Sequence, residues 1–256
     1  MNWDIIKKGG LNMALRFATM LSKFVLVFIL AKYLSIEDLG LYGLFFVSVG
    51  ISIYLVGLDF YTFSLRDILG RARSDWYQYC SQQFKLYLIV YFVALPFLLL
   101  IFWLGILPWK LVGWFLLLVV MGHIGTELYR LLVAMGTPIL ASCSLFIRVG
   151  AWMYVLAIVC FYNPSQFRID YVWPAWACGE LLGNVLAIWG VYPIFKERDA
   201  TSIEGFAWIQ KGIVIALPFF IGTLAMRGIY TLDRYYLDFF TSRETVGIFS
   251  LFMGLA

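Results

Sequence analysis

Charged residues are scarce in this sequence of 256 residues. Aspartate, glutamate, lysine and arginine together make up 13% of the chain, against about 25% in an average soluble domain. So few charges cannot cover a water-exposed surface of ordinary composition, which argues against a soluble globular protein. We therefore expect nearly all of the chain to lie in a lipid bilayer.

Metal-binding and redox motifs are also missing. The sequence contains one histidine and four cysteines, and the cysteines show no Cys-x-x-Cys spacing, so neither disulfides nor structural zinc are expected. We interpret the cysteines as small apolar side chains within the bundle. They are Cys80, Cys143, Cys160 and Cys178.

The sequence also lacks motifs for nucleotide, cofactor or sugar-transfer chemistry. It has no glycine-rich phosphate loop and no Asp-x-Asp pair. The connectors between its apolar runs are short and leave no room for a soluble catalytic domain. We therefore expect no cofactor, no nucleic-acid partner and no enzymatic activity.

What the sequence does contain is a series of long apolar runs. Hydrophobic residues make up 63% of the chain, and the mean hydropathy is +0.88. A membrane-spanning helix needs roughly 20 mostly apolar residues, and that template fits about eight times. This predicts an all-α fold, a polytopic membrane helical bundle truncated in its eighth span. The expected spans are residues 11–33, 39–60, 84–105, 111–133, 139–161, 171–193, 213–235 and 245–256.

A segment that follows the first apolar run recurs near the end of the sequence. Residues 34–44 read Leu-Ser-Ile-Glu-Asp-Leu-Gly-Leu-Tyr-Gly-Leu, and residues 241–251 read Thr-Ser-Arg-Glu-Thr-Val-Gly-Ile-Phe-Ser-Leu. In each copy the serine can cap the following helix, and the glutamate complements the helix dipole. The repeat predicts two lobes of similar plan. The six-helix N-terminal lobe is expected at 1–195 and the truncated start of the C-terminal lobe at 213–256. A cytoplasmic linker at 196–212 joins them.

The lysines and arginines of the connectors are unevenly divided between the two sides. Placing the N-terminus in the cytoplasm puts most of them inside, as the positive-inside rule favours. We then expect both serine-glutamate loops outside, and residues 62–83 as a helix or turn on the cytoplasmic interface. The inside charges are Lys7, Lys8, Arg66, Arg71, Arg73, Lys85, Lys196, Arg198 and Lys211, and the outside charges are Lys32, Lys110, Arg168, Arg234 and Arg243.

Polar side chains form stripes along two of the predicted spans. A charge inside a bilayer is costly unless it meets a partner or a cavity. The first span carries cations on one helix face and contains no acid, so their partner is either a substrate anion or an acid on another helix. The first stripe is Asn12, Arg16, Thr19 and Lys23, and the seventh span repeats its spacing with Thr223, Arg227, Tyr230 and Arg234.

Ionisable residues in the fourth to sixth spans allow two interpretations. Glu127, Arg130, Arg148 and Glu180 either neutralise one another between packed helices or take part in transport. We interpret the sole histidine, His123, as a helix-packing group, with a proton relay as the alternative. The sixth span also carries a mixed aromatic and polar face, formed by Trp173, Trp176, Glu180 and Asn184.

Two further features concern the bending and the ends of the spans. Pro218 and Gly222 permit a kink in the seventh span and are candidates for a moving hinge. Asp59 and Asp233 lie near predicted span ends, where we expect interfacial side chains.

Several short motifs occur in a characteristic order. A Lys-Gly-Gly start at residues 8–10 precedes the first span, and the segment at 34–43 opens the second. Glu-Leu-Tyr-Arg at 127–130 with Ala-Met-Gly at 134–136 closes the fourth span, and Ala-Leu-Pro-Phe at 216–219 with Leu-Asp-Arg at 232–234 lies in the seventh. In this order the motifs resemble the repeat-unit flippases of O-antigen, lipopolysaccharide and capsule biosynthesis. These flippases belong to the multidrug, oligosaccharidyl-lipid and polysaccharide exporter superfamily.

The resemblance implies a V-shaped transporter with two six-helix lobes around a central cavity, alternating between inward-open and outward-open states. Family members have about twelve to fourteen spans, so the chain corresponds to their N-terminal part. The implied location is the bacterial cytoplasmic (inner) membrane, with the N-terminus in the cytoplasm. The implied partners are a lipid-linked oligosaccharide, membrane lipids and other polysaccharide-assembly proteins.

The implied function is translocation of an undecaprenyl-pyrophosphate-linked oligosaccharide, whose anionic group requires cationic side chains in the cavity wall. The expected substrate-binding residues are Arg16, Lys23 and Arg227, assisted by Arg130, Arg148, Asn12 and Thr19; the candidate ion-coupling residues are Glu127, His123 and Glu180. One alternative is a cation-coupled drug or metabolite antiporter of the same superfamily, for which the first stripe has the wrong sign. Others are a peptidoglycan-precursor flippase and, in a different class, a membrane-embedded polysaccharide-assembly enzyme.

Overall fold

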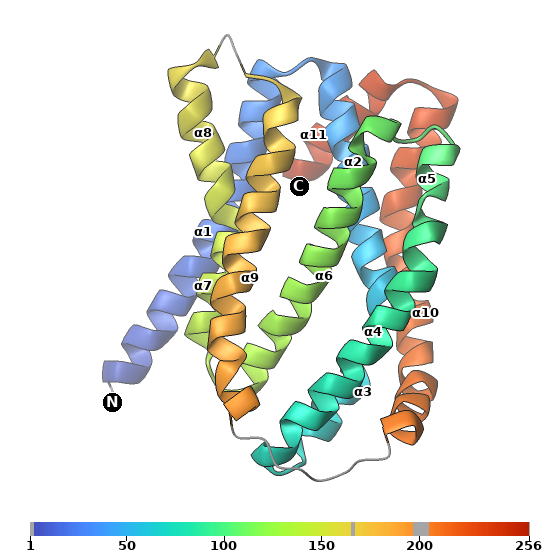
Figure 1. Ribbon diagram of the computed structural model, residues 1–256. Coiled ribbons are helices and arrows are strands. Elements are labelled where there is room, and N and C mark those ends of the chain that lie inside the picture. The colour runs from blue at the N-terminus through green and yellow to red at the C-terminus, as the bar shows by residue number, and fades with distance from the viewer. Residues whose placement is uncertain (1–2, 165–166, 197–204, 256) are drawn as a thin grey trace.

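The chain folds into a helical bundle, described by a computed structural model for residues 3–164, 167–196 and 205–255, and these ranges contain no strand. Figure 1 shows the long helices running up and down the bundle, joined by short connectors at its two ends. A π-helical segment, Ile147–Ala151, joins α7 to α8. The α-helices are α1 (Trp3–Tyr33), α2 (Ile36–Gly57), α3 (Tyr61–Leu69), α4 (Trp76–Leu98), α5 (Leu100–Trp103), α6 (Val112–Ala134), α7 (Pro138–Phe146), α8 (Trp152–Tyr162), α9 (Val172–Lys196), α10 (Gly205–Phe240) and α11 (Arg243–Leu255).

Seven helical stretches in the described ranges are long and apolar enough to cross a bilayer. Each overlaps one of the first seven predicted spans, which confirms the polytopic membrane helical bundle. A helix satisfies its own backbone hydrogen bonds, and a chain in lipid has no water to do so. The seven stretches are Gly9–Tyr33, Ile36–Gly57, Arg73–Trp103, Trp109–Ala134, Pro138–Tyr162, Ile169–Lys196 and Gly205–Phe240.

The connectors gather at two ends of the bundle (Figure 1). The start of α1, helix α3 and the α6–α7 turn lie at one end, which we call the N side. The loops before α2 and α11 lie at the opposite end, the far side. This is the grouping that the charge pattern predicts, while the assignment of the N side to the cytoplasm remains a prediction.

The sequence predicts that residues 62–83 lie on the cytoplasmic interface as a helix or turn, but this segment is divided between two helices. Helix α3 ends at Leu69, and α4 begins at Trp76 within the spanning stretch Arg73–Trp103. Trp76 and Tyr79 are buried. These aromatic side chains pack the polar start of α4 onto the bundle. Only the part before Arg73 lies outside the spanning stretches.

Serines of the repeated segment cap α2 and α11. The Ser35 hydroxyl accepts a hydrogen bond from the backbone N–H of Asp38 at 3.1 Å, and that of Ser242 accepts one from the N–H of Thr245 at 3.3 Å. Both copies therefore begin a helix at the same position of the repeat, as the sequence predicts.

The two copies of the repeat pack against each other through their glycines. A Cβ atom added to Gly40 would lie 2.1 Å from the carbonyl oxygen of Arg243, and one added to Gly247 would lie 2.3 Å from that of Ile36. Ile36 and Arg243 hold matching positions in the two copies, so the contact is reciprocal. Glycines allow this close approach because they carry no side chain. The two copies therefore approach each other in equivalent ways.

The boundaries of the lobes remain a prediction. Residues 205–212 of the predicted linker are already part of α10. Residues 197–204, which include Arg198, lie outside the described residues, as do the side chains of Lys7 and Lys8.

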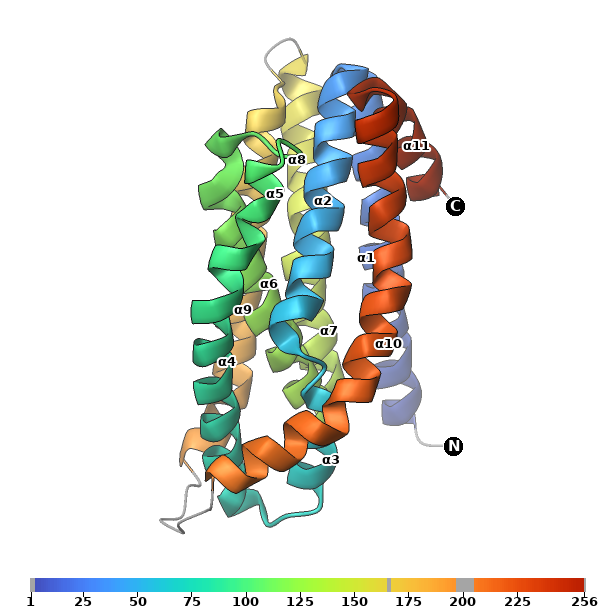
Figure 2. The same ribbon diagram turned by 90° about the vertical axis from the view of Figure 1, so that its right-hand side faces the viewer.

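The first part of α10 is fixed to the N side of the bundle. Figure 2 shows α10 bent, with its lower part crossing towards α3 and α4, and Pro218 lies within this helix. The ring of Trp208 packs 5.4 Å from those of Phe60 and Phe63. Its Nε1 donates a hydrogen bond to Asp67 at 2.9 Å. Proline removes one backbone hydrogen bond and so permits the bend.

Candidate functional site

The predicted stripe on α1 is divided between packing and exposed positions. Asn12 accepts a hydrogen bond from Ser142 of α7, and Thr19 is buried with its hydroxyl bonded to the carbonyl of Leu15 at 2.8 Å. Arg16 and Lys23 are exposed. Asn12 and Thr19 therefore hold helices in place, and the two cations remain on the surface of α1.

The exposed arginines of α1 and α10 bind tyrosines. Arg16 donates to the hydroxyl of Tyr129 on α6 at 3.1 Å. Arg227 is exposed on α10 and donates to the hydroxyl of Tyr54 on α2 at 2.8 Å. The Arg227 guanidinium also lies 4.4 Å from the centroid of the Tyr54 ring. A phenol orients a guanidinium without cancelling its charge.

We call Arg16, Lys23 and Arg227 the unpaired cations. Among the described residues, none of the three forms an ion pair with an acidic side chain. Helices α1 and α10 both contact α2, and in Figure 2 both lie to its right.

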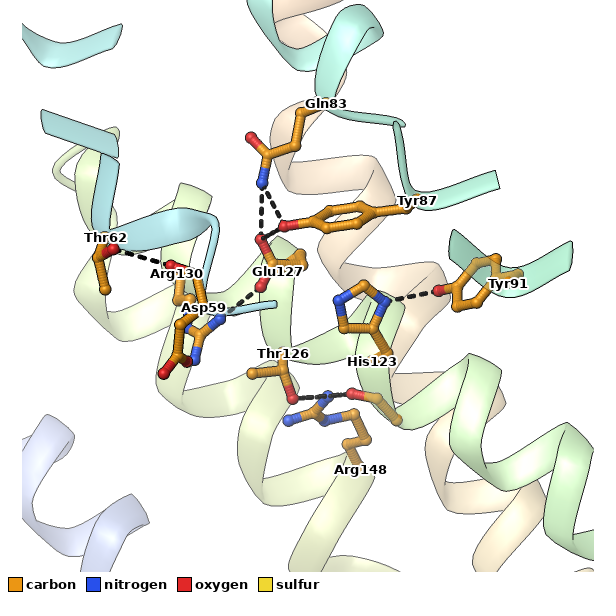
Figure 3. Close-up of polar contacts among 11 residues, drawn as sticks. Asp59, Thr62, Gln83, Tyr87, Tyr91, His123, Thr126, Glu127, Arg130 and Arg148 are labelled. Carbon is orange, nitrogen blue, oxygen red and sulfur yellow. Dashed lines mark hydrogen bonds and ion pairs between the residues drawn. The ribbon is translucent and has the colours of Figure 1, made fainter. Parts of the chain in front are cut away.

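A network of neutral and charged groups surrounds Glu127 on α6 (Figure 3). One carboxylate oxygen accepts hydrogen bonds from Gln83 at 2.8 Å and from the hydroxyl of Tyr87 at 2.9 Å. The other forms an ion pair with Arg130, whose guanidinium lies 3.3 Å from the ring centroid of Tyr61. Three donors thus compensate the Glu127 charge within the bundle.

His123, one turn before Glu127, is held on one side only. Its Nδ1 shares a hydrogen bond of 2.6 Å with the hydroxyl of Tyr91, and the Tyr87 ring meets the imidazole edge to face at 4.5 Å. The side chain is 1% exposed, and Nε2 has no hydrogen-bond partner among the described residues. The donor and acceptor roles at Nδ1 depend on the tautomer.

Arg148 is buried on the π-helical segment and faces α6 and α9. Its Nη1 donates to the carbonyl oxygen of Gly122 at 2.9 Å, and its Nε lies 3.6 Å from a carboxylate oxygen of Glu180. That distance gives an ion pair without a hydrogen bond. A Cβ on Gly125 would lie 2.2 Å from the Arg148 guanidinium, so this glycine makes room for the charge.

The mixed face of α9 turns inward. Trp173 lies 4.3 Å from Phe45, ring centroid to ring centroid, in the apolar core. Trp176 donates to Glu180 at 3.4 Å, and Asn184 donates to the carbonyl of Met121 at 2.9 Å. These side chains hold α9 against the bundle.

The acids and arginines of the fourth to sixth spans are therefore paired as Glu127 with Arg130 and Arg148 with Glu180. This is the arrangement that neutralisation between packed helices predicts. Asp59, which was expected near a span end, follows the spanning stretch Ile36–Gly57 and has a buried side chain. Asp233 is exposed.

Sequence reasoning missed the polar residues of α4 and the tyrosines that bind arginine. Gln83, Tyr87 and Tyr91 follow an i, i+4, i+8 spacing that places them on one helix face, a signal present in the sequence. No such spacing identifies Tyr54 or Tyr129, because each meets an arginine from a distant helix.

Comparison of the sequence with protein-family models, with curated proteins and with solved structures found no match in any of the three. Any function therefore has to follow from the chemistry of these side chains.

Proposed function

We propose that this chain forms the first lobe, and the start of the second, of a transporter that moves an undecaprenyl-pyrophosphate-linked oligosaccharide across the bacterial cytoplasmic membrane. Seven helices able to span a bilayer fit a membrane transporter in general. The observation that carries the proposal is the set of unpaired cations on α1 and α10, within the predicted spans and without an acidic partner among the described residues.

An anionic group in the substrate is the partner that these cations lack. A cation in the membrane interior costs several kcal/mol unless it meets a counter-charge or a water-filled cavity. Guanidinium groups bind phosphate oxygens through paired, charge-assisted hydrogen bonds. Tyr54 and Tyr129 already orient two of the guanidiniums, so less side-chain entropy is lost when a pyrophosphate binds. The lipid tail can stay in the bilayer.

Not all of the cations expected to bind the substrate anion have an uncompensated charge. Arg130 and Arg148 each lie against a carboxylate, so their charge is already compensated. We assign anion binding to the unpaired cations, and bundle packing to Arg130, Arg148, Asn12 and Thr19.

The ion pairs of Arg130 and Arg148 also argue against the antiporter alternative. A cationic drug requires an uncompensated acid in the cavity wall. Glu127 and Glu180, the acids that kept this alternative open, each lie beside an arginine. Neither therefore offers a cationic drug an uncompensated charge, and the proposal keeps an anionic substrate.

Binding of undecaprenyl pyrophosphate to the protein in lipid nanodiscs, read by native mass spectrometry, tests the anion site. The double variant Arg16→Ala, Lys23→Ala should bind at least about tenfold more weakly, and Arg227→Ala likewise. Lys110→Ala is the matched control, because Lys110 is also exposed but lies in the short turn Trp109–Leu111 that precedes α6. Equal binding by all these variants would remove the basis for the proposal.

A further inference from the structure

A small polar cavity lies between α2, the turn that follows it and α6, and we call it the α2–α6 cavity. Its volume is about 140 Å³, which at roughly 30 Å³ per molecule corresponds to about five waters. A space of this size holds one sugar ring but no longer part of an oligosaccharide. The residues that line it include Gly50 and Tyr54 of α2, Asp59 of the turn, and His123 and Arg130 of α6.

Asp59 is a buried acid without a partner in the wall of this cavity. It is 4% exposed and forms no ion pair among the described residues. The hydroxyl of Thr62 donates to the backbone carbonyl of Asp59, at 2.8 Å, and not to its carboxylate. Figure 3 shows Asp59 beside Arg130, whose charge is paired with Glu127. A buried carboxylate requires hydrogen-bond donors, and a ligand rich in hydroxyl groups supplies them.

His123 contributes a second unpartnered polar atom to the same cavity. Its Nδ1 is bonded to Tyr91, whereas its buried Nε2 has no partner among the described residues. Nε2 lies beside Gly57, which also lines the cavity, and a Cβ added to Gly57 would be 3.2 Å from it. A hydroxyl group both donates and accepts hydrogen bonds, so it can bind Nε2 in either tautomer of the ring.

The α2–α6 cavity lies beside the tyrosines that orient the proposed anion ligands. Tyr54 lines the cavity, and its hydroxyl accepts a hydrogen bond from Arg227 at 2.8 Å. Arg130 also lines the cavity, and the residue before it, Tyr129, accepts one from Arg16 at 3.1 Å. A group held in the cavity is therefore close to the guanidiniums that we assign to the pyrophosphate.

We propose that the α2–α6 cavity binds the sugar ring attached directly to the pyrophosphate and selects a neutral sugar, an inference that rests on the proposed function. The hydroxyls of such a ring donate to the Asp59 carboxylate and form a hydrogen bond with Nε2 of His123. Glu127 compensates the charge of Arg130, so Asp59 leaves the cavity with an uncompensated negative charge. This charge repels the carboxylate of an acidic sugar, and more strongly in a buried site than in water.

Native mass spectrometry of the protein in lipid nanodiscs tests the sugar site with undecaprenyl pyrophosphate and with the same lipid carrying glucose or glucuronic acid. The wild type should bind the glucose lipid at least about tenfold more tightly than the other two. Asp59→Ala should bind the glucose lipid no better than undecaprenyl pyrophosphate, whose affinity should not change. Asparagine tolerates the positive φ of 47° at this position, so Asp59→Asn should keep the fold and bind the glucose and glucuronic acid lipids alike. Asp233→Ala, at an exposed acid of α10, is the control and should retain the wild-type preference.

Gly50→Leu tests the cavity without changing a charge. Gly50 lines the cavity, and a Cβ added to it has no neighbour within 4 Å. A leucine side chain there should occupy the space of the sugar ring, so the glucose lipid should bind no more tightly than undecaprenyl pyrophosphate. Gly113→Leu is the matched control, because a Cβ at Gly113, near the start of α6, also has no neighbour within 4 Å. This variant should keep the wild-type preference.

Failure of the sugar site can be distinguished from failure of the anion site. Arg227→Ala should weaken the binding of all three lipids by the same factor and leave the preference for glucose unchanged. A wild type that binds none of the lipids would contradict the proposed anion site, and the sugar site is then tested with methyl glucoside by saturation-transfer NMR, whose signal should disappear in Asp59→Ala. Equal binding of the three lipids by the wild type, an unchanged preference in Asp59→Ala, or no methyl glucoside signal where the lipids do not bind would overturn the proposal.

Discussion

At the scale of single residues, Arg148 and Glu180 form a buried ion pair. Removing either charge alone should destabilise the protein. We expect Glu180→Gln to lower the free energy of unfolding by about 3–5 kcal/mol, because Arg148 then remains buried without its counter-charge. Adding Arg148→Met should restore much of that loss. The measurement is equilibrium denaturation in detergent micelles. Glu37→Gln, at an exposed glutamate of α2, is the control and should change stability by less than about 1 kcal/mol. A double variant no more stable than Glu180→Gln would show that the two charges do not compensate each other.

The sequence identifies the charges inside the membrane but not their partners. Glu127 could be predicted to need compensation, yet Gln83 and Tyr87 lie 44 and 40 residues away from it in the chain. The burial of Asp59, which follows an apolar run and adopts a positive φ of 47°, could not be predicted from the sequence either. Side-chain partners across helices depend on rotation and tilt, which hydropathy does not specify.

At the scale of helices, the contact between α2 and α11 depends on glycines of the two repeat copies. Gly247→Ala should destabilise the protein by about 1–3 kcal/mol, because the new methyl would meet the backbone oxygen of Ile36 at 2.3 Å and the backbone cannot easily yield. Thermal unfolding in micelles measures the effect. Gly228→Ala is the control, since a Cβ there has no neighbour within 4 Å. Equal unfolding temperatures for the two variants would contradict the close packing of the repeats.

A second contact between elements, that of Trp208 with α3, should depend on pH. Burial raises the pKa of Asp67, but hydrogen bonds from Arg71 and Trp208 lower it, and the net pKa lies below its usual value. A carboxyl with a lower pKa in the folded state stabilises the fold above its unfolded pKa, about 4, and this contribution is lost as the pH falls through the folded pKa. We therefore expect α10 to loosen from α3 in acid.

Amide hydrogen exchange of residues 205–212, corrected for the intrinsic effect of pH, measures that loosening. Protection should fall below about pH 4 in the wild-type protein. In Asp67→Asn it should be low already at neutral pH and change little in acid. Glu244→Gln, at an exposed acid on the far side, should behave like the wild type. Loosening in acid that is equally large in Asp67→Asn would show that another group is responsible.

Helix positions could be predicted more fully than helix contacts. A span is defined locally, by the length of an apolar run that must satisfy its own backbone in lipid, and all seven spans follow this rule. The start of α4 could not be placed in this way, because the segment at 76–83 is polar and is held by buried aromatic residues, Trp76 and Tyr79 among them. The serine caps at Ser35 and Ser242 could be predicted, since capping is also local.

At the scale of the whole molecule, the two copies of the repeat meet through reciprocal glycine contacts between α2 and α11. In the proposed transporter the two copies belong to two similar units, and the unpaired cations of α1 and α10 are contributed by the first helix of each unit. A substrate anion bound by both helices would link the two lobes, and a change in their angle would expose it to either side of the membrane. Transport then requires cations from both units.

Glycan export by the protein, in a bacterial strain that lacks its own flippase, is the measurement that tests the substrate site most directly. Surface polysaccharide is quantified alongside the amount of protein in the membrane, for the wild type, the Arg16→Ala, Lys23→Ala double variant, Arg227→Ala and the control Lys196→Ala. We predict that export is abolished in the double variant and in Arg227→Ala at unchanged protein levels, because the pyrophosphate then lacks its oriented cations, while Lys196→Ala exports normally. Full export by the double variant would contradict the assignment of the unpaired cations as the substrate site.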